Sequence, residues 1–576
     1  MQCEKINGMQ VEKMSHKDLQ GFIKALEKKG ELKRIKAEVS SELEITEIAD
    51  RISKEYGSAL LFEKVKDSPY PLLINAMGTF KRMSMALEAE TLDEIGDEIK
   101  EYLELRNYLT LKGLIRSIPR LFRLLYALPL KRPGKGKCQQ IIEKEVNLYN
   151  LPVLKCWPLD AGRFFTLPLV FTKDRNTKQQ NVGMYRLQIL DEKTTGMHWH
   201  KHKDGSEIYG GYKAKGERMP VSVALGCDPA ITYAATAPLP KMLDEMMLAG
   251  WLRKSNVTMV KCITNDIYVP ANAEIVLEGY VDTTEELVLE GPFGDHTGYY
   301  SLADYYPRFH VTCITHRKAA IYPATVVGKP PMEDCYMAKA TERIFLPILK
   351  MQIPELKDIN LPLEGVFHNC AILSVRSAYP GCARKVMNAV WGMGQMMYTK
   401  LVVIVNENVD VQNLKEVGQA VLRNVGSLND LLLSEGPLDA LDHSSDKALY
   451  GTRLGVDATT ERDTTGKESF QVIQVSKKYP GEAKDLLMKH LKDKNDKFVI
   501  AVDDSVDISN FSLVMWKLFN NIDAKRDLIA LENKFGIDAT KKWKEEGLTR
   551  DWPEDITMSQ EIIDLVSERW KEYGLD

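Results

Sequence analysis

AEIVLEGYV, residues 273–281, decides the fold class of the middle of the chain. The stretch is rich in β-branched residues and lacks the spacing of an amphipathic helix, so it predicts a strand. Three further stretches have the same character: PVSVALG at 220–226, VTMVKCI at 257–263 and RFHVTCITH at 308–316. One helical pattern, PKMLDEMMLAGWLRK at 240–254, interrupts them. The sequence therefore predicts a β-rich central domain.

On both sides of this region, helical and strand patterns alternate. Before it, DLQGFIKALEKKGEL at 18–32 has the spacing of a helix, and ALLFEKV at 59–65 that of a strand. After it, the helical pattern ARKVMNAVWGMGQM at 383–396 is followed by the strand pattern KLVVIV at 400–405. Such alternation is typical of α/β domains. The fold class expected for the whole chain is therefore mixed α/β.

The C-terminal region contains a repeat. KLVVIVNENVDV at 400–411 resembles KFVIAVDDSVDI at 497–508, and LGVDAT at 454–459 resembles FGIDAT at 535–540. Two matching elements in the same order indicate a partial duplication. The predicted organisation is an N-terminal α/β domain with a basic connecting segment at 1–140, the central domain at 141–325, a C-terminal α/β domain at 326–470 and its shortened copy at 471–576.

Composition excludes several classes of function. The 576 residues are 44% hydrophobic, enough for several cores, and the net charge of −4 gives no basis for binding nucleic acid. Nine cysteines without a CxxC pair favour a reducing compartment over a disulfide framework. The first residues lack the apolar core of a signal peptide, and no apolar run of about 18 residues is present. We therefore expect a cytoplasmic protein.

The segment from Leu105 to Ile142 contains no acidic residue. Its basic residues are Arg106, Lys112, Arg116, Arg120, Arg123, Lys131, Arg132, Lys135 and Lys137. Leucine, isoleucine and phenylalanine alternate with these arginines, as in a segment that lies on a membrane surface. A packed connecting helix, interrupted by Pro119 and Pro129, is the other interpretation. Peripheral contact with the inner face of a membrane through residues 105–137 thus remains open.

MHWHKHKDG, residues 197–205, places three histidines at alternate positions. An extended strand would direct His198, His200 and His202 to one face. On its own the stretch fits a zinc or copper site, a pH-sensitive patch or a solvated basic edge strand.

LEGPFGDHTGYYS, residues 289–301, places two carboxylates on either side of a tight Gly-Pro-Phe-Gly turn. Glu290 and Asp295, with His296 beside the latter, can divide acid and base roles if they are buried unequally. NVGMYR at 181–186 adds Arg186, and an arginine near two carboxylates keeps one ionised and binds an anionic substrate. A solvated hairpin turn is the alternative interpretation.

Together these motifs carry a resemblance. NVGMYRLQ, MHWHKHKDG, LDEMMLAGWLR, AEIVLEGY and EGPFGDHTGYY, in this order, are similar to motifs of the UbiD family of prenylated-flavin-dependent aromatic acid decarboxylases. The similarity runs from about residue 15 through GKPPMED at 328–334 to GVDAT at 455–459. It is closest to the branch that acts on 4-hydroxybenzoate-type acids in quinone biosynthesis. The resemblance implies a central split β-barrel like that of flavin reductases.

The resemblance also implies a divalent cation, Mn²⁺ or Mg²⁺, that joins the protein to the phosphate of prenylated FMN. The matching ligands are Asn181, His202 and Glu245, a set that suits a hard cation better than zinc. Flavin-binding positions are implied at these ligands and at Met184, Tyr185, Arg186, His198, Trp199, His200, Lys203 and Asp204. His198 and His200 replace the Arg and Leu of the hydroxybenzoate relatives, so phosphate contact and a supporting role both remain open.

The same resemblance assigns Arg186, Glu290 and Asp295 to an acid–base network in which Asp295 donates a proton. An aspartic acid that does so near neutral pH needs a raised pKa, so we expect a pocket poor in water. The implied reaction is the non-oxidative, reversible decarboxylation of a hydroxybenzoate- or naphthoate-type acid in ubiquinone or menaquinone synthesis. The cofactor carries the difficult step, and the protein orients the substrate.

The resemblance further implies a K⁺ site, a supplier of the cofactor and an oligomer. Arg423 matches the arginine that helps hold K⁺, whereas the second copy has Asn520 there, so we expect the first copy to serve the active site. The second copy is expected to be an accessory lobe or an oligomer contact. A flavin prenyltransferase would supply the cofactor. A homo-oligomer, a dimer or a hexamer, is expected, with the last helix, SQEIIDLVSERWKEYG at 559–574, contributing to assembly.

Two other classes of function remain open. A catalytically inactive flavin-binding protein of the same fold is expected to lack part of the acid–base or metal set, and both sets are intact here. A flavoprotein reductase also fits a split barrel, although no GxGxxG fingerprint follows a strand. Prenylated FMN in the protein favours the decarboxylase, and ordinary FMN with NAD(P)H turnover favours the reductase.

Overall fold

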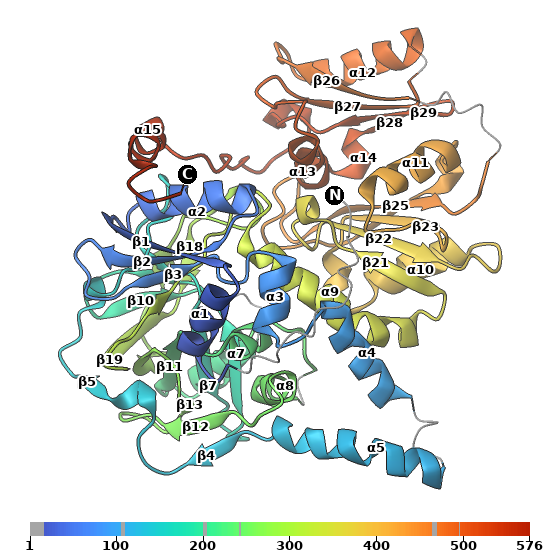
Figure 1. Cartoon of the computed structure of the whole chain (residues 1–576). Coiled ribbons are helices and arrows are strands. Elements are labelled where there is room, and N and C mark those ends of the chain that lie inside the picture. The colour runs from blue at the N-terminus through green and yellow to red at the C-terminus, as the bar shows by residue number, and fades with distance from the viewer. Residues whose placement is uncertain are drawn as a thin grey trace.

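The structure is a computed structural model of the chain, and it describes residues 16–104, 110–199, 204–240, 243–462, 469–494 and 496–575. The N-terminal and central parts lie on one side of the molecule, and two C-terminal sheets lie on the other (Figure 1). A long helix, α9 (Glu333–Gln352), runs between the two sides. The predicted mixed α/β fold is confirmed.

The N-terminal part is a small sheet with helices packed on it. Its strand order is β1-β2-β3-β20, with β1 (Leu32–Val39), β2 (Ala59–Val65), β3 (Leu72–Ile74) and β20 (Tyr322–Pro323). The helices are α1 (Leu19–Lys28), α2 (Glu44–Lys54), α3 (Phe80–Ala86) and α4 (Leu92–Leu103). Since β20 follows the central strands in sequence, the chain returns to this sheet after it has built the centre.

A nine-stranded sheet forms the centre of the molecule, and its main path is β6-β9-β10-β19-β14-β11-β7-β8, with β5 paired to β19. The strands are β5 (Ile141–Glu143), β6 (Phe164–Phe165), β7 (Leu169–Lys173), β8 (Gln180–Met184), β9 (Leu187–Ile189), β10 (Thr194–Met197), β11 (Met219–Leu225), β14 (Ile275–Val281) and β19 (Arg308–His316). The strand patterns at 220–226, 273–281 and 308–316 thus lie side by side in its middle.

The connection between β8 and β9 explains why this sheet curls. The two strands lie near opposite ends of the strand order, yet only Tyr185 and Arg186 join them in sequence. The three Cα–Cα steps from Met184 to Leu187 span at most about 11 Å, so the two ends of the sheet must approach each other. The sheet is therefore a split half-barrel, as predicted, and Tyr185 and Arg186 lie where its ends meet.

Short elements surround the half-barrel. They are α5 (Leu111–Arg123), the 3₁₀ turn η2 (Leu124–Ala127), β4 (Leu130–Arg132), α6 (Asp204–Lys213), α7 (Pro229–Ala234), α8 (Glu245–Leu252), β12 (Thr258–Lys261), β13 (Tyr268–Pro270), β15 (Val288–Glu290), β16 (Phe293–Gly294), β17 (Tyr300–Ser301) and β18 (Asp304–Tyr306). Because β4 pairs with β12, the chain joins the central part before the predicted boundary at residue 140.

Two sheets of the same topology form the C-terminal part. The first has the order β21-β22-β23-β25-β24, with β21 (Leu356–Asn360), β22 (Cys370–Val375), β23 (Leu401–Asn406), β24 (Leu431–Pro437) and β25 (Tyr450–Ala458). The second has the order β26-β27-β29-β28, with β26 (Phe470–Val475), β27 (Phe498–Asp503), β28 (Leu528–Leu531) and β29 (Lys534–Asp538). In both, three parallel strands are followed by one antiparallel strand, and the first sheet has a second antiparallel strand, β21, at its other edge.

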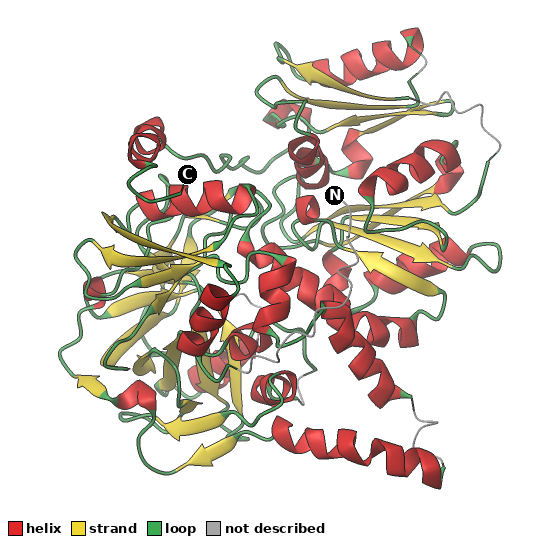
Figure 2. Cartoon of the chain, viewed as in Figure 1, coloured by secondary structure: helices red, strands yellow, loops and turns green. Residues whose placement is uncertain are grey.

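The helices follow the same duplication. They are α10 (Cys382–Trp391) and α11 (Leu414–Asn424) in the first copy, and α12 (Glu482–Asp493), α13 (Phe511–Asn521) and the short α14 (Ala524–Asp527) in the second. Helices lie against both sheets (Figure 2), which is why β22 is buried along its whole length. The predicted partial duplication is confirmed, and β21 is the strand that the second copy lacks.

The last helix, α15 (Gln560–Arg569), returns to the N-terminal part and packs on α2 (Figure 1). Arg51 donates hydrogen bonds to the carbonyl oxygen of Ile563 at 2.8 Å and to Ser567 Oγ at 3.0 Å. The hydroxyl of Tyr573 donates to the buried Glu44 at 2.7 Å. The structure therefore gives this segment an intramolecular role, where the sequence predicted a contribution to assembly. No helix in the described part of the chain is long and apolar enough to cross a bilayer.

Candidate functional site

Arg186 lies at the centre of a buried charge network. Its Nε and Nη2 donate hydrogen bonds to the two carboxylate oxygens of Glu290 at 2.8 and 3.1 Å, and its Nη1 donates to Asp295 at 2.5 Å. Nη2 also donates to Ser301 Oγ at 3.0 Å. The guanidinium lies over the ring of Phe293, 4.6 Å from its centroid. The structure thus brings together the three residues of the predicted acid–base network.

Glu290 is fully buried, with 0% of its surface exposed, and is ionised. Burial raises the pKa of this carboxyl, but hydrogen bonds from His198 and Arg186 outweigh that effect and hold it at about 2. His198 Nδ1 lies 2.9 Å from Glu290 Oε2. Burial and the charge of Arg186 lower the pKa of His198, so His198 is a neutral donor to the carboxylate. The hydrogen bond from His198 thus supports the ionised form of Glu290.

The pKa of the Asp295 carboxyl differs from the value expected for a proton donor. Burial acts to raise the pKa of its carboxyl, yet the hydrogen bond from His296 and the charge of Arg186 hold that pKa well below its usual range. His296 Nδ1 lies 2.9 Å from Asp295 Oδ1, and the same carboxylate raises the pKa of His296 despite its burial. The predicted raised pKa of Asp295 is therefore wrong, because Arg186 and His296 both bind its carboxylate.

A second buried acid fixes the loop that carries these residues. Asp160 accepts hydrogen bonds from the backbone N–H of Gly294 at 2.7 Å, Trp157 at 2.9 Å and Cys156 at 3.1 Å. Burial raises the pKa of Asp160 to about 7 in spite of these bonds. Gly291 begins the turn with φ +90°, a conformation that favours glycine. The Gly-Pro-Phe-Gly turn is therefore a buried, anchored loop, and the solvated-turn interpretation does not apply.

Two of the three predicted metal ligands lie side by side. Asn181, on β8, donates from Nδ2 to Oε1 of Glu245, the first residue of α8, at 3.2 Å. The Oδ1 atom of Asn181 is buried and has no hydrogen-bond partner among the described residues. Burial raises the pKa of Glu245 to about 7. A hard cation would bind Asn181 Oδ1, which has no described partner, and would stabilise the ionised form of the Glu245 carboxylate beside it.

The structure describes only part of the histidine-rich stretch. The strand β10 ends at Met197, His198 and Trp199 follow outside any strand, and α6 begins at Asp204. Three predicted site residues, His200, His202 and Lys203, lie outside the described residues. No group of three or more His, Cys, Asp or Glu that could hold a metal occurs among the residues that are described. The alternating edge strand expected here is therefore not the local structure of His198.

Aromatic side chains and glycines lie close together near Asn181. A Cβ added at Gly183 would be 2.5 Å from the ring of Tyr185, and one added at Gly205 would be 2.7 Å from Trp199 Nε1. That indole nitrogen is buried without a hydrogen-bond partner in the described part of the chain. Met184 packs partly buried between two apolar clusters. Of the described flavin-binding positions, Met184 and Tyr185 thus follow Asn181 along the chain and Trp199 packs against the start of α6, whereas Arg186 and His198 bind Glu290.

The predicted K⁺ residue lies elsewhere. Arg423 is exposed at the end of α11, and its carbonyl oxygen accepts a hydrogen bond from Lys497 of the second copy at 3.3 Å. Figure 1 places α11 far from α8, which carries Glu245. The structure therefore does not bring Arg423 to the other predicted site residues.

Both C-terminal copies, and not the first alone, lie near the acid–base network. From the second copy, Trp516 on α13 donates its indole N–H to the carbonyl of Thr297 at 2.8 Å and stacks on Tyr299. From the first copy, His368 lies with its Nε2 at 3.1 Å from His296 Nε2. The second copy thus contacts the loop that follows Asp295 and His296, and its role as an accessory lobe or an oligomer contact stays a prediction.

Sequence reasoning missed several residues of this site. These are Asp160, Ser301, Asp334, His368 and Trp516. Asp334 belongs to the GKPPMED motif, which was recognised without a role for this residue. Ser301 ends the motif at 289–301, which was likewise given no role for it, whereas Asp160, His368 and Trp516 lie outside the motifs and reach the site only through tertiary packing.

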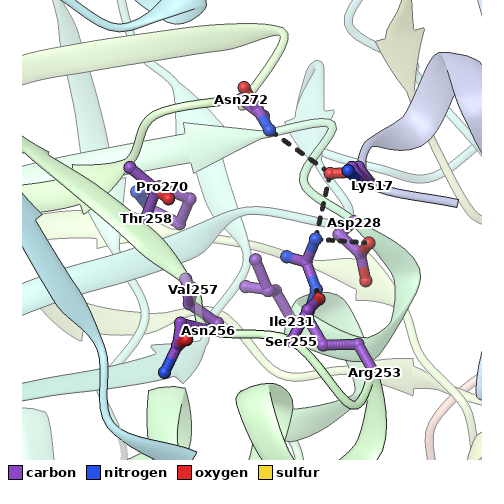
Figure 3. Close-up of a pocket in the computed structure, with 10 residues that line it drawn as sticks. All are labelled: Lys17, Asp228, Ile231, Arg253, Ser255, Asn256, Val257, Thr258, Pro270 and Asn272. Carbon is purple, nitrogen blue, oxygen red and sulfur yellow. Dashed lines mark hydrogen bonds and ion pairs between the residues drawn. The ribbon is translucent and has the colours of Figure 1, made fainter. Parts of the chain in front are cut away.

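One cavity lies outside this site. A cavity of about 180 Å³ is lined by Lys17, Asp228, Ile231, Arg253, Ser255, Asn256, Val257, Thr258, Pro270 and Asn272 (Figure 3). Arg253 follows the last residue of α8, whereas Glu245 begins that helix. The guanidinium of Arg253 is engaged by Asp228 at 3.7 Å, Ser255 Oγ at 3.0 Å and the Lys17 carbonyl at 3.3 Å. Its charge is thus satisfied within the protein.

Fold and site together define a class of protein: a split half-barrel with an arginine held between two carboxylates where its ends meet. Three domain models of one family, each named for 3-octaprenyl-4-hydroxybenzoate carboxy-lyase, match the chain. The N-terminal domain matches residues 23–99, the Rift-related domain 130–330 and the C-terminal domain 335–458 and 464–547. The chain belongs to the UbiD family and is a carboxy-lyase.

Similar proteins occur in distant organisms. A protein of Archaeoglobus fulgidus is 50% identical over 457 residues, which are 79% of this chain and 94% of that protein. A protein of Aquifex aeolicus is 39% identical over 97% of this chain and 99% of its own length. The second relative therefore matches nearly the whole chain, including most of the duplicated region.

Solved structures share the fold. The vanillic acid decarboxylase of Sedimentibacter hydroxybenzoicus, in closed form, is 26% identical over 83% of this chain and 99% of that chain, with a TM-score of 0.68. The UbiD-class enzyme HmfF from Pelotomaculum thermopropionicum, in complex with FMN, is 24% identical over 81% of this chain and 98% of its own, with a TM-score of 0.67. Part of this chain thus has no counterpart in either structure.

Proposed function

We propose that this protein decarboxylates an aromatic carboxylic acid, of the hydroxybenzoate or naphthoate type, with prenylated FMN as cofactor. The observation that carries the proposal is the buried Arg186–Glu290–Asp295 network, joined through β8 to the Asn181–Glu245 pair. The network offers a cation for the substrate carboxylate and acidic groups for proton transfer. Related structures hold FMN or prenylated FMN, and one relative acts on vanillic acid, a hydroxybenzoate. A reversible reaction and a place in quinone biosynthesis are part of the proposal.

The described residues fit such a cofactor and its metal. Asn181 Oδ1 and the Glu245 carboxylate would bind Mn²⁺ or Mg²⁺, with His202 as the third ligand, because no ion pair between these oxygens and a described residue balances the buried carboxylate. Tyr185, Trp199 and the neighbouring Met184, His198, His200, Lys203 and Asp204 would line the flavin. When bound, prenylated FMN accepts the electrons that remain as carbon dioxide departs. A K⁺ site that Arg423 helps to form is a separate prediction.

The chain itself would orient the substrate, exclude water and deliver a proton. Arg186 is held by two carboxylates, so its geometry is fixed before the substrate arrives. The burial of Glu290 and Asp295 keeps water away from the network. One proton must be added where the carboxylate was lost, and the Asp295–His296 pair holds it. Asp295 is the proposed donor, and His296 supplies it.

The test uses protein coexpressed with a flavin prenyltransferase, which we propose as the cofactor supplier. The bound flavin is extracted and identified, and carbon dioxide release is measured with a panel of hydroxybenzoates and naphthoates. We expect prenylated FMN and release from at least one acid. Protein produced without the prenyltransferase is the control, and it should release none. Ordinary FMN with NAD(P)H turnover in the coexpressed protein would instead establish the reductase alternative.

The Glu245→Ala variant is expected to lose both divalent metal and prenylated FMN, because it removes the charged ligand of the proposed site. Metal analysis and the flavin absorbance of the purified protein measure the two occupancies. Glu286, exposed on a turn of the same part of the chain, provides the matched control Glu286→Ala. Wild-type occupancy of both metal and flavin in Glu245→Ala would disprove the metal assignment.

We also propose peripheral contact of residues 105–137 with an anionic membrane. On α5 and η2, Phe122 is 64% exposed and Leu125 is 54% exposed, although both are apolar. Exposed neighbours of the same kind are Ile115, Ile118, Leu121, Leu124, Leu128 and Leu130. The absence of acidic residues between Leu105 and Ile142 suits anionic lipid headgroups. The expected homo-oligomer, a dimer or hexamer, is the competing occupant of this surface.

The wild-type protein is expected to sediment with vesicles that contain phosphatidylglycerol and to bind less as salt rises, because exposed charges are screened. Leu125→Ser should weaken this binding, since it removes apolar surface from the contact. Leu486, exposed on α12, gives the control Leu486→Ser, which should bind like wild type. If the wild-type protein does not sediment with the vesicles, the surface is not a membrane contact. The same conclusion follows if Leu125→Ser changes the oligomeric state and leaves vesicle binding unchanged.

A further inference from the structure

His296 and His368 meet where the central and C-terminal parts of the chain join. Their Nε2 atoms are 3.1 Å apart, and His296 Nδ1 is 2.9 Å from Asp295 Oδ1. The three side chains therefore form one hydrogen-bonded chain, from the carboxylate to a residue that lies 73 positions beyond Asp295 in the sequence. Among the hydrogen bonds of the described residues, the one with His296 links His368 to the network, and none joins it to Arg186 or Glu290.

A strained turn presents His368. Val366 and Phe367, just after the 3₁₀ turn η5 (Leu363–Gly365), have φ angles of +43° and +54°. Left-handed backbone is costly for side chains of these types and persists only where the surroundings enforce it. The ring of Phe367 stacks on His296 with centroids 4.8 Å apart. The strained turn thus places the ring of Phe367 against His296 and the imidazole of His368 at His296 Nε2.

The second C-terminal copy holds this turn. Ser512, on α13, donates from its hydroxyl to Glu364 at 2.8 Å. Asn369 Nδ2 donates to Asn520 Oδ1 at 2.8 Å, and Asn520 Nδ2 donates to the carbonyl of Glu364 at 3.4 Å. Residues on both sides of the strained pair are therefore tied to α13. This is a role for the duplicated unit that its sequence does not suggest.

The charges around the two imidazoles decide which of them holds a proton. His296 faces Asp295, Asp334 at the start of α9, and Asp439 after β24, as well as His368. His368 faces Asp439, Asp442 and His296. The carboxylates raise the pKa of His296 in spite of burial, and burial lowers the pKa of His368. A protonated His296 donates from both nitrogens, so a neutral His368 accepts the hydrogen bond from Nε2.

We propose that His368 is a positioning residue that keeps His296 protonated and oriented toward Asp295, so that the Asp295–His296 pair stores the proton for the acid step. The inference rests on the proposed decarboxylation. In that step the Asp295 O–H bond breaks as a C–H bond forms on the substrate, and the proton on His296 Nδ1 passes to Asp295. Water reprotonates His296, so one proton is consumed for each carbon dioxide released.

The test compares His368→Phe with His368→Gln in the prenylated-FMN-loaded enzyme. Phe removes the acceptor, whereas the amide oxygen of Gln can replace it. We expect kcat/KM of His368→Phe to fall about tenfold at alkaline pH, because a hydrogen bond to a charged group is lost. The alkaline limb of the pH profile of kcat/KM for His368→Phe should move toward lower pH, and the acid limb should change little. His368→Gln should restore the wild-type profile. His310, which pairs with Glu285 on the outer side of β19, gives the control His310→Gln.

A second readout does not need activity. In protein labelled with ¹³C at the histidine Cε1, the His296 signal is assigned by its loss in His296→Asn. We expect this signal to titrate at lower pH in His368→Phe than in wild type or His368→Gln. An unchanged His296 titration in His368→Phe overturns the inference. If no aromatic acid is decarboxylated by wild type but the titration shifts as expected, the proposed function fails while the coupling of the two histidines stands.

Discussion

Asp295→Asn is expected to lower the turnover of the loaded enzyme by about 10²–10⁴-fold, the usual contribution of a general acid. Asparagine has nearly the same size, so cofactor and substrate should still bind. It cannot carry the proton that His296 supplies, because an amide does not titrate in this range. Steady-state kinetics give the loss of kcat, and substrate titration of the flavin absorbance gives the dissociation constant.

The control for this change lies on the duplicated turn. Asp504 is exposed and remote from the network, so Asp504→Asn should turn over at nearly the wild-type rate. If Asp295→Asn keeps more than about a tenth of wild-type activity, less than the loss that general acid catalysis predicts, the proton comes from elsewhere. His296 would then be the donor itself, and His296→Asn should show the large loss.

Arg186→Ala is expected to lower the free energy of unfolding by about 3–5 kcal/mol, the usual cost of removing one partner of a buried ion pair. Two buried carboxylates, Glu290 and Asp295, would remain without the cation that now binds both. Turnover should also collapse and KM rise, because the substrate carboxylate loses its partner. Denaturant unfolding and steady-state kinetics measure the two effects.

The destabilisation by Arg186→Ala should depend on pH. Glu290 has a pKa of about 2 in the folded wild type, below its ordinary value of 4.5, so its ionisation stabilises the fold above pH 4.5. This contribution is lost as pH falls from 4.5 toward 2. Without Arg186 the pKa of Glu290 rises. The difference between variant and wild type should therefore be large at neutral pH and shrink under acid conditions.

Arg34 offers a matched control on the surface. Its guanidinium also bridges two carboxylates, Glu27 at 2.5 Å and Glu63 at 3.0 Å, but its side chain is 45% exposed. Solvent screens such pairs, so Arg34→Ala should cost only about 0–1 kcal/mol. Equal losses of unfolding free energy in Arg34→Ala and Arg186→Ala would contradict the view that Arg186 stabilises buried charges.

The sequence predicted the fold wherever a local pattern was long and regular. The strands at 59–65, 273–281 and 308–316 were recognised from their apolar, β-branched residues, and the repeat at 400–411 and 497–508 from its similarity to itself. These patterns reflect burial, which tertiary structure enforces along a whole element. Fold class and duplication were therefore accessible without coordinates.

The candidate site was accessible only in part. Arg186, Glu290 and Asp295 were paired through family resemblance, and the structure places them in contact. His368 was not recognised, because its contact with His296 depends on how two parts of the chain pack. The pKa of Asp295 was expected to be raised because a proton donor near neutral pH needs this, but hydrogen bonds from His296 and Arg186 lower it, and their strength depends on the packed geometry.

The surroundings of the C-terminal residues could not be predicted for a related reason. The comparison of Arg423 with Asn520 assumed that equivalent positions in a duplicated unit face equivalent surroundings. In the structure, α13 packs on the loop at Thr297–Tyr299, while Arg423 lies exposed on α11. Duplication preserves local structure, but each copy meets different neighbours. The terminal helix packs on α2 of the same chain, and its contribution to assembly stays a prediction.

The measurement that tests the central claim most directly is decarboxylation in D₂O by the prenylated-FMN-loaded enzyme. Aromatic acids are supplied one at a time, and carbon dioxide and the decarboxylated product are both quantified. The account predicts equal amounts of the two from at least one hydroxybenzoate or naphthoate, with one deuterium at the carbon that lost its carboxylate. No carbon dioxide from any acid, although prenylated FMN and metal are both bound, would contradict it.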